Sequence, residues 1–289
     1  MTFFLTQIVK PSSRAGRLCQ FVFLLLATCQ AGGFLFADAS QPPTREAGDN
    51  RSAAPLTARY TPAPVTIDGE MTEPAWTTTP KVLLAWQTTL DKQARPVSRP
   101  GAWVRLLWDD RFLYMAARCR DRDLIASLTR RDSKVWKEDA LEFFLKPEDG
   151  DSPYFEFQWN PLGTILDGFW PRRKAGTLRD VARWNCEAVV AVRVDGTLND
   201  RNDPDRGWQI EVRIPFADLR PIIARPPRAG ESWRALVASY NFTLLPRWAK
   251  IKTSTAPCRF FHEYEVYSTL TFDKTGPPPA ENALAPEDG

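Results

Sequence analysis

Carboxylate, amide and indole side chains gather in two neighbouring stretches in the middle of the chain. Glu142 alternates with apolar residues in the first stretch, and Gln158 and Asn160 alternate with aromatic residues in the second, while Trp136 stands just before the first. Successive side chains of an extended strand point to opposite faces, so each stretch has an apolar face and a polar face. A carboxylate and two amides beside an indole could hydrogen-bond hydroxyl groups and stack on a flat apolar ring face.

Turn-forming residues join these two stretches. The segment from Lys146 to Pro153 has a proline at each end of a run of acidic residues, glycine and serine. Such residues favour turns, so the sequence predicts an antiparallel hairpin made of strands at 141–145 and 154–160. We expect the apolar face of this hairpin to enter a core and its other face to gather the polar side chains.

The same residues carry a resemblance to a known family. The spacing Trp-x-x-Asp-x-x-Glu at Trp136, Asp139 and Glu142, followed by a strand with Glu, Gln and Asn, resembles the family 9 carbohydrate-binding modules and the wider group of family 9-like domains. Further family-like segments follow one another in the right order, at residues 67–76, 107–114 and 207–215. The resemblance spans about residues 61–273 and implies an all-β, antiparallel β-sandwich that binds saccharide and is not an enzyme.

The resemblance also implies roles for individual residues. It places a sugar-stacking platform at Trp136 and a hydroxyl acceptor at Glu142, with weaker support for Gln158 and Asn160, because many family members carry an arginine where Gln158 stands. It places a second aromatic side chain before the last strand, for which we select Trp248, with Phe260 and Phe261 as substitutes. The expected ligand is a saccharide or a polysaccharide chain end.

Two further features follow from the resemblance. Family 9 modules carry structural calcium, and the acidic loop at residues 148–151 offers oxygen ligands, although no ligand spacing in the sequence is diagnostic. Trp208 and Glu211 belong to a Gly-Trp-x-x-Glu motif, for which we expect structural roles, the tryptophan in the core and the glutamate in an ion pair.

Composition excludes several other classes of protein. With 43% hydrophobic residues and 11 tryptophans in 289 residues, the chain can bury a core. Its net charge of +3 arises from 38 basic and 35 acidic residues that are interspersed, so no basic stripe points to nucleic acid. We expect a monomer.

The first residues are typical of an export signal. Three basic residues precede an apolar run at 21–27, and Ala37-Asp38-Ala39 offers a cleavage site, which predicts a signal peptide over residues 1–39 and a periplasmic or extracellular protein. Lipid attachment at Cys29 and an uncleaved anchor remain alternatives, and no later segment is long and apolar enough to span a bilayer. The exported chain would keep Cys119, Cys186 and Cys258, of which the first two lie among apolar residues as buried thiols; one disulfide stays open and its pairing cannot be read from the sequence.

The rest of the chain predicts one domain. Residues 40–60 form a disordered leader, residues 61–273 form a sandwich of about ten short strands, and residues 274–289 form a disordered tail. Residues 81–89 predict one strand, and apolar residues at helical spacing predict a short helix within 123–130.

Parts of the sequence are compatible with three alternative functions. Glu138, Asp139 and Glu142 could serve a glycosidase, but Asp139 and Glu142 fall on opposite faces of one strand, which argues against it. A related sandwich binds haem in periplasmic oxidoreductases, and Met71, Met115 and His262 are the candidate axial ligands here. A scaffold domain with a decayed sugar site is the third alternative.

Overall fold

The computed structural model describes residues 52–173, 175–243 and 249–275. The predicted signal peptide, the leader up to residue 51, the tail from residue 276 and the predicted site residue Trp248 therefore lie outside the described residues.

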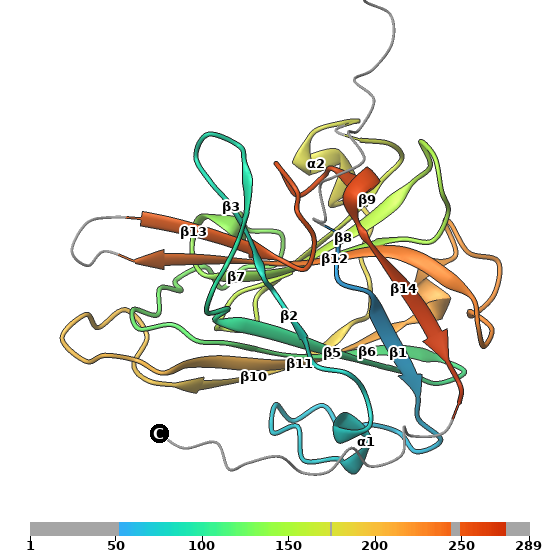
Figure 1. The fold of residues 1–289 in the computed structure, drawn as a ribbon, viewed down its shortest axis with the longest axis horizontal. Coiled ribbons are helices and arrows are strands. Elements are labelled where there is room, and N and C mark those ends of the chain that lie inside the picture. Colours follow the sequence, from blue (N-terminus) through green and yellow to red (C-terminus); the bar gives the residue numbers. More distant parts are fainter. Residues whose placement is uncertain (1–51, 174, 244–248, 276–289) are drawn as a thin grey trace, which may run out of the picture. The chain divides into compact units, whose positions relative to one another are not determined.

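Two layers of β-strands make up the described domain (Figure 1), as the sequence predicted. The lower layer in the figure is mainly antiparallel and contains β10 (Val189–Asp195), β11 (Gly207–Pro215), β6 (Phe112–Cys119), β5 (Ala102–Trp108), β2 (Val82–Leu83) and β1 (Leu56–Tyr60). The upper layer contains β9 (Ile165–Trp170), β8 (Tyr154–Trp159), β7 (Ala140–Lys146), β12 (Ser232–Thr243), β13 (Ala249–Ser254), β3 (Trp86–Thr88) and β4 (Ala94–Pro96). Strand β14 (Ser268–Asp273) pairs with β1 and β12 and so joins the layers.

Helices are few and short in the described residues. They are α1 (Pro74–Thr77), α2 (Leu178–Val181) and the 3-10 turns η1 (Val135–Lys137), η2 (Phe216–Leu219) and η3 (Tyr264–Val266). The all-β class is therefore confirmed, and none of the described helices is long and apolar enough to cross a membrane.

The hairpin of β7 and β8 supplies much of the core between the layers. Phe143 and Phe157 face each other across the two strands, and their rings stack at a centroid distance of 6.4 Å. Both side chains are fully buried together with the inward residues of β6 and β11. Burying an aromatic side chain of this kind contributes about 1.5–3 kcal/mol, so the predicted apolar face is what fixes the hairpin in the sandwich.

The domain begins earlier than predicted. Residues 56–60, which we assigned to the leader, form β1, which pairs in parallel with both β14 and β5. Leu56 and Ala58 are buried in the core, so this strand gains enough apolar burial to stay ordered despite its polar neighbours. The predicted strand at 81–89 is also divided into β2 and β3, which pair in different layers.

No helix forms at residues 123–130, contrary to the prediction. Their backbone N–H groups donate to buried side chains instead: Leu124 N to Asp205 Oδ2 (2.7 Å), Ile125 N to Asp139 Oδ2 (2.6 Å) and Ser127 N to Glu138 Oε2 (2.8 Å). These carboxylates take the donors that a helix would use internally, which explains why the apolar spacing did not produce one.

Glu211 makes no ion pair with any of the described residues, contrary to the prediction. Its carboxylate accepts hydrogen bonds from the Trp76 indole N–H and from the Gly69 backbone N–H, both at 2.7 Å. Gly69 lies in a turn and has a φ of +84°. The motif therefore ties the segment around α1 to β11, while Trp208 lies in the core as predicted.

The cysteines within the described ranges are all buried. Cys119, Cys186 and Cys258 are free thiols, which confirms the burial predicted for the first two, and no disulfide joins any of the three.

Candidate functional site

A cavity of about 310 Å³ opens on the outer face of β7 and β8, the face directed away from the core. Alternation along the hairpin produces this arrangement, because Phe143 and Phe157 enter the core while Glu142, Glu156 and Gln158 line the cavity. Both faces of the hairpin are nevertheless buried, so the polar face is the floor of a covered pocket and not an open surface.

Glu142 and Gln158 form the centre of that floor. They are directly opposite each other in the β7–β8 register and are only 1% and 3% exposed. Glu142 Oε2 and Gln158 Oε1 have no hydrogen-bond partner among the described residues. Two buried acceptors thus lie together at the base of the pocket, each of which loses free energy unless a ligand or water donates to it.

Glu156 is held in place beside them. One of its carboxylate oxygens accepts from Gln158 Nε2 and the other from the Trp170 indole N–H, both at 2.6 Å. Burial raises the pKa of Glu156 to about 7, although these two hydrogen bonds oppose the rise. Glu156 therefore positions Gln158 so that its carbonyl oxygen is the part left for a ligand.

The electrostatics around Glu142 favour its neutral form. Burial is the main cause that raises its pKa well above the ordinary value, and repulsion by Glu156 adds to it, while Lys250, Lys252 and a hydrogen bond from Tyr240 act in the opposite direction. Burial also lowers the pKa of Lys250 to about 8. A protonated Glu142 can donate as well as accept a hydrogen bond, which suits a hydroxyl group as partner.

Lys250 also fixes the position of Trp136. Its ammonium donates to the Trp136 carbonyl oxygen at 2.7 Å and lies 3.8 Å from the centroid of the Tyr240 ring. Trp136 itself is part of η1 and lines the cavity with a partly exposed side chain. The indole is thus anchored through its backbone, and its ring is left to contact a ligand.

Aromatic rings form the walls of the pocket. Trp170 stacks on Tyr154 with an interplanar angle of 8°, and Tyr240 packs against Phe261 at 5.2 Å between centroids. The ring centroids of His262 and Trp170 are 5.0 Å apart, and His262 Nδ1 forms a hydrogen bond of 2.8 Å with the Tyr154 hydroxyl. Packed rings of this kind hold their orientation and can stack on the apolar face of a sugar.

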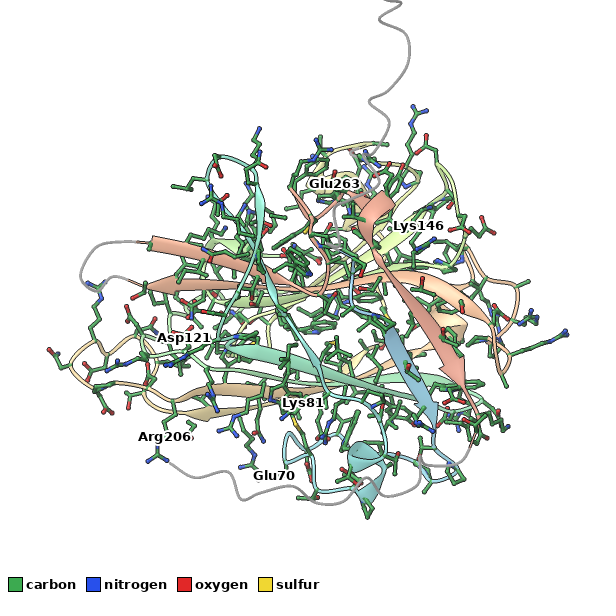
Figure 2. The ribbon with its side chains drawn as sticks, in the orientation of Figure 1. Glu70, Lys81, Asp121, Lys146, Arg206 and Glu263 are labelled. Carbon is green, nitrogen blue, oxygen red and sulfur yellow. The ribbon has the colours of Figure 1, made fainter. Side chains whose placement is uncertain are left out.

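The turn that carries Phe260 to His262 is closed by Glu263, which Figure 2 labels at the upper layer. The Glu263 carboxylate accepts from the Arg259 backbone N–H and from Arg259 Nε, both at 2.8 Å. Since Glu263 is buried, this pair holds the rings over the pocket.

The structure brings together three of the five predicted site residues, Trp136, Glu142 and Gln158, and both substitutes, Phe260 and Phe261. Trp248 lies outside the described residues.

Asn160 does not line the cavity, contrary to our expectation. Strand β8 ends at Trp159, so the alternation of the strand stops before Asn160, and this residue begins a turn. Its amide donates to Leu128 O (2.8 Å) and Glu138 Oε1 (2.6 Å), and its Oδ1 accepts from two backbone N–H groups of the turn. All of its hydrogen-bonding capacity is used inside the protein, which makes it a structural residue.

Several pocket residues were not predicted as saccharide-site residues, among them Glu156, Trp170, Tyr240 and Lys252. Glu156 shares the polar face of β8 with Gln158, so the alternation alone could have identified it. Trp170, Tyr240 and Lys252 come from β9, β12 and β13, and only the long-range pairing of these strands brings them to β7 and β8.

The alternative chemistries find less support in the geometry. Asp139 accepts backbone N–H groups of Ile125 and Phe242, both at 2.6 Å, so it is already engaged within the protein and does not line the pocket beside Glu142. The three candidate haem ligands lie in different parts of the domain. Met115 is in the main core, Met71 packs near α1 and His262 lines the pocket, so the structure does not bring them together around one haem.

Calcium stays a prediction. Within the described ranges no group of three or more His, Cys, Asp or Glu side chains is arranged to hold a metal ion. In the predicted loop, Asp151 accepts from the Tyr264 hydroxyl at 2.6 Å and Asp149 lies 3.4 Å from Arg234.

Comparison with known proteins agrees with the fold and the motifs. Residues 67–160 match the model of the carbohydrate family 9 binding domain-like family. A stretch of 103 residues is 34% identical to endo-1,4-beta-xylanase A of Thermotoga maritima, and this match covers 35% of the chain and 8% of the xylanase.

Two solved structures of a family 9 carbohydrate-binding module from Caldicellulosiruptor kristjanssonii, one in complex with cellotriose and one with glucose, share the fold. Each superposes with a TM-score of 0.52, at 15% and 14% identity, and covers 82% and 78% of this chain and the whole of the module. The matched family consists of non-catalytic binding modules. Residues 67–160 therefore match the carbohydrate family 9 binding domain-like family, and the described domain shares the fold of a family 9 carbohydrate-binding module.

Proposed function

We propose that the pocket over β7 and β8 binds a saccharide, either the end of a polysaccharide chain or a short oligosaccharide. The observation that carries this proposal is the pair of unpartnered buried oxygens, Glu142 Oε2 and Gln158 Oε1, on the floor of a pocket with aromatic walls. Sugar hydroxyls supply the missing hydrogen bonds, and the apolar faces of a pyranose ring pack on Trp136 and Trp170.

The size of the pocket favours a small ligand. Its volume of about 310 Å³ lies at the lower end of the range typical of small-molecule sites, roughly 300–1,000 Å³. A few hydrogen bonds and stacking contacts, each worth about 1 kcal/mol net, give micromolar to millimolar dissociation constants.

The first probes are chosen from the relatives. Since the structures of the related module hold cellotriose and glucose, we would titrate both into the purified protein and screen it on an array of neutral and charged glycans. Saturable binding of at least one saccharide supports the proposal. An absorbance spectrum of the same preparation serves as a control, because a Soret band would favour haem, and a protein that binds no saccharide and no haem would favour a scaffold role.

We also propose that this domain works outside the cytoplasm, after removal of residues 1–39. The support is the basic residues, apolar run and small-residue cleavage site at the start of the sequence.

A further inference from the structure

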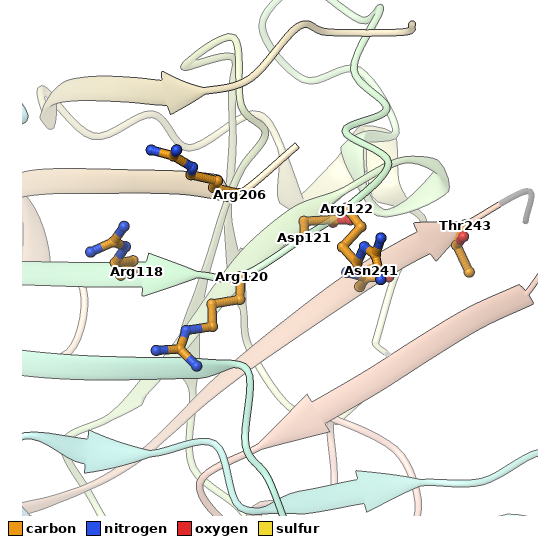
Figure 3. Close-up of a pocket in the computed structure, with 7 residues that line it drawn as sticks. All are labelled: Arg118, Arg120, Asp121, Arg122, Arg206, Asn241 and Thr243. Atoms are coloured by element: carbon orange, nitrogen blue, oxygen red, sulfur yellow. The ribbon is translucent and has the colours of Figure 1, made fainter. Parts of the chain in front are cut away.

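A second hollow, of about 670 Å³, lies where β6 ends and β11 begins (Figure 3). Four arginines line it, Arg118, Arg120, Arg122 and Arg206, together with Asp121 and Asn241. Figure 3 shows Arg118, Arg120 and Arg206 on one side of the hollow, and Arg122 near Asn241 on the other. The hollow is therefore a concentration of positive charge that comes from two separate segments of the chain.

The backbone fixes these arginines next to one another. Gly207 has a φ of +130°, and a Cβ atom at this position would lie 2.0 Å from the Cys119 carbonyl oxygen, so only glycine allows this close approach of β11 to the end of β6. The Asp121 N–H donates to Arg206 O at 3.4 Å, and the Arg120 N–H donates to Gly101 O at 2.7 Å. The segment that carries Arg206 is thereby held against the segment that carries Arg118 to Arg122.

The positive charge of the hollow is largely uncompensated. Among the described residues, Arg118, Arg120 and Arg122 are exposed and make no ion pair, and Arg206 reaches Asp195 only at 3.9 Å between two exposed side chains. Such exposed pairs contribute little stability, so the guanidinium groups have no structural role that would explain their convergence. Guanidinium groups bind carboxylate and sulfate oxygens through paired hydrogen bonds.

Asp121 adds a feature that a simple anion site lacks. It is 5% exposed and lines the hollow among the arginines, and burial raises its pKa to about 7. In its protonated form this carboxyl group repels no anion and can hydrogen-bond to hydroxyl groups. The hollow thus presents partners for oxyanions and for hydroxyls at the same time.

The shape of this region indicates an extended ligand. A neighbouring hollow of about 270 Å³ shares Arg120, Asp121 and Asn241 with the first and reaches Gln87 and Thr253. A single inorganic ion would leave most of this space empty. Nucleic acid fits less well, because none of the described side chains that line the arginine hollow is aromatic and could stack on a base, and the basic residues elsewhere are interspersed with acidic ones.

We propose that the arginine hollow is a second binding site, which takes an acidic saccharide, a short chain of sugars bearing carboxylate or sulfate groups. The arginine hollow shares no lining residue with the pocket on β7 and β8, although the neighbouring hollow reaches Tyr240, which also lines that pocket. The proposal does not depend on the function of the pocket on β7 and β8.

The test uses the full chain and three hexasaccharides as probes: oligogalacturonate for carboxylates, a heparin-derived fragment for sulfates, and cellohexaose as the neutral reference. The double variant Arg118→Gln/Arg120→Gln should weaken binding of at least one acidic probe by at least about tenfold, because two charged donors are lost. The variant Arg130→Gln/Arg228→Gln removes the same net charge from exposed arginines elsewhere and should change binding less than about twofold.

Two further measurements decide the outcome. Raising the salt concentration from 50 to 200 mM should lower the affinity for the acidic probe and leave the affinity for cellohexaose unchanged. Glu142→Gln should leave the acidic probe bound with unchanged affinity, which separates this site from the neutral pocket. The proposal is overturned if neither acidic probe binds, if the control variant loses as much affinity as the hollow variant, or if a single-stranded DNA oligomer binds the hollow more tightly than both acidic probes.

Discussion

Glu142 on β7 and Gln158 on β8 lie opposite each other, and each keeps one buried oxygen without a partner in the described part of the chain. A folded domain leaves few such atoms, because an unpaired buried acceptor costs about 1–3 kcal/mol. Their juxtaposition in one pocket, more than the missing partners alone, supports the proposed saccharide site, which the first and the last prediction below test.

Trp136 and Phe143 should separate binding from stability. Trp136 is partly exposed at the pocket, so Trp136→Ala should lower saccharide affinity with little change in melting temperature. Phe143 is fully buried and stacks on Phe157, so Phe143→Ala should lower the free energy of unfolding by roughly 3–5 kcal/mol. Denaturant unfolding and calorimetric titration of both variants measure the two effects. If Trp136→Ala lowers the free energy of unfolding as much as Phe143→Ala does, Trp136 has a structural role and the prediction is wrong.

Asn160→Ala should act on stability alone. The substitution removes two donors and two acceptor contacts from a fully buried position, and each buried group left unpaired costs about 1–3 kcal/mol. We expect a clear drop in the free energy of unfolding, while the protein that remains folded binds saccharide with the affinity of the wild type. Weaker saccharide binding by the fully folded variant would contradict this prediction and indicate that Asn160 contributes to binding.

Glu156 should make stability depend on pH. Its pKa is raised from the ordinary 4.5 to about 7 in the folded protein, so folding favours the protonated form. The resulting stabilisation is fully present below about pH 4.5 and is lost as the pH rises through about 7.

The variant Glu156→Gln tests this effect, because it keeps the shape of the side chain and cannot titrate. It also removes the repulsion that helps to raise the pKa of Glu142. The free energy of unfolding of the wild type, minus that of the variant, should fall between pH 5 and pH 8. Asp121 and Asp139 have raised pKa values too, and subtracting the variant removes their contribution. A difference that stays constant with pH would show that Glu156 is ionised throughout this range.

Export should produce a mature N-terminus close to Ser40, because the cleavage site Ala37-Asp38-Ala39 ends there. Expression of the full chain with its own leader, followed by intact-mass and N-terminal peptide analysis, identifies the terminus. An acylated Cys29 would replace this prediction with a lipid-anchored protein.

Local patterns predicted the part of the molecule that local rules control. Strict alternation identified β7, β8, β6 and β11 and placed Glu142 and Gln158 on one face, because the side chains of a strand point to opposite sides whatever surrounds it. The same rule failed at Asn160, where the strand ends one residue earlier. Helical spacing failed at residues 123–130, where buried carboxylates from other segments take the backbone donors.

Residues that reach the pocket by long-range pairing had no local signal. Tyr240 faces Ala140 only because β12 pairs with β7, and Lys252 faces Tyr240 only because β13 pairs with β12. Strand order across a sandwich depends on the packing of the whole core, which a single sequence does not display.

The most direct test of the saccharide site is a calorimetric titration of the wild type and of Glu142→Gln with the best ligand from the glycan array. Glutamine preserves the shape of Glu142 but replaces a carboxyl oxygen with an amide group that cannot accept a hydrogen bond, so we predict an affinity lower by roughly 1–2 kcal/mol, about five- to thirtyfold. The melting temperature should be unchanged or slightly higher, because a buried carboxyl group is removed. Wild-type affinity in a correctly folded Glu142→Gln protein would contradict the assignment of this pocket.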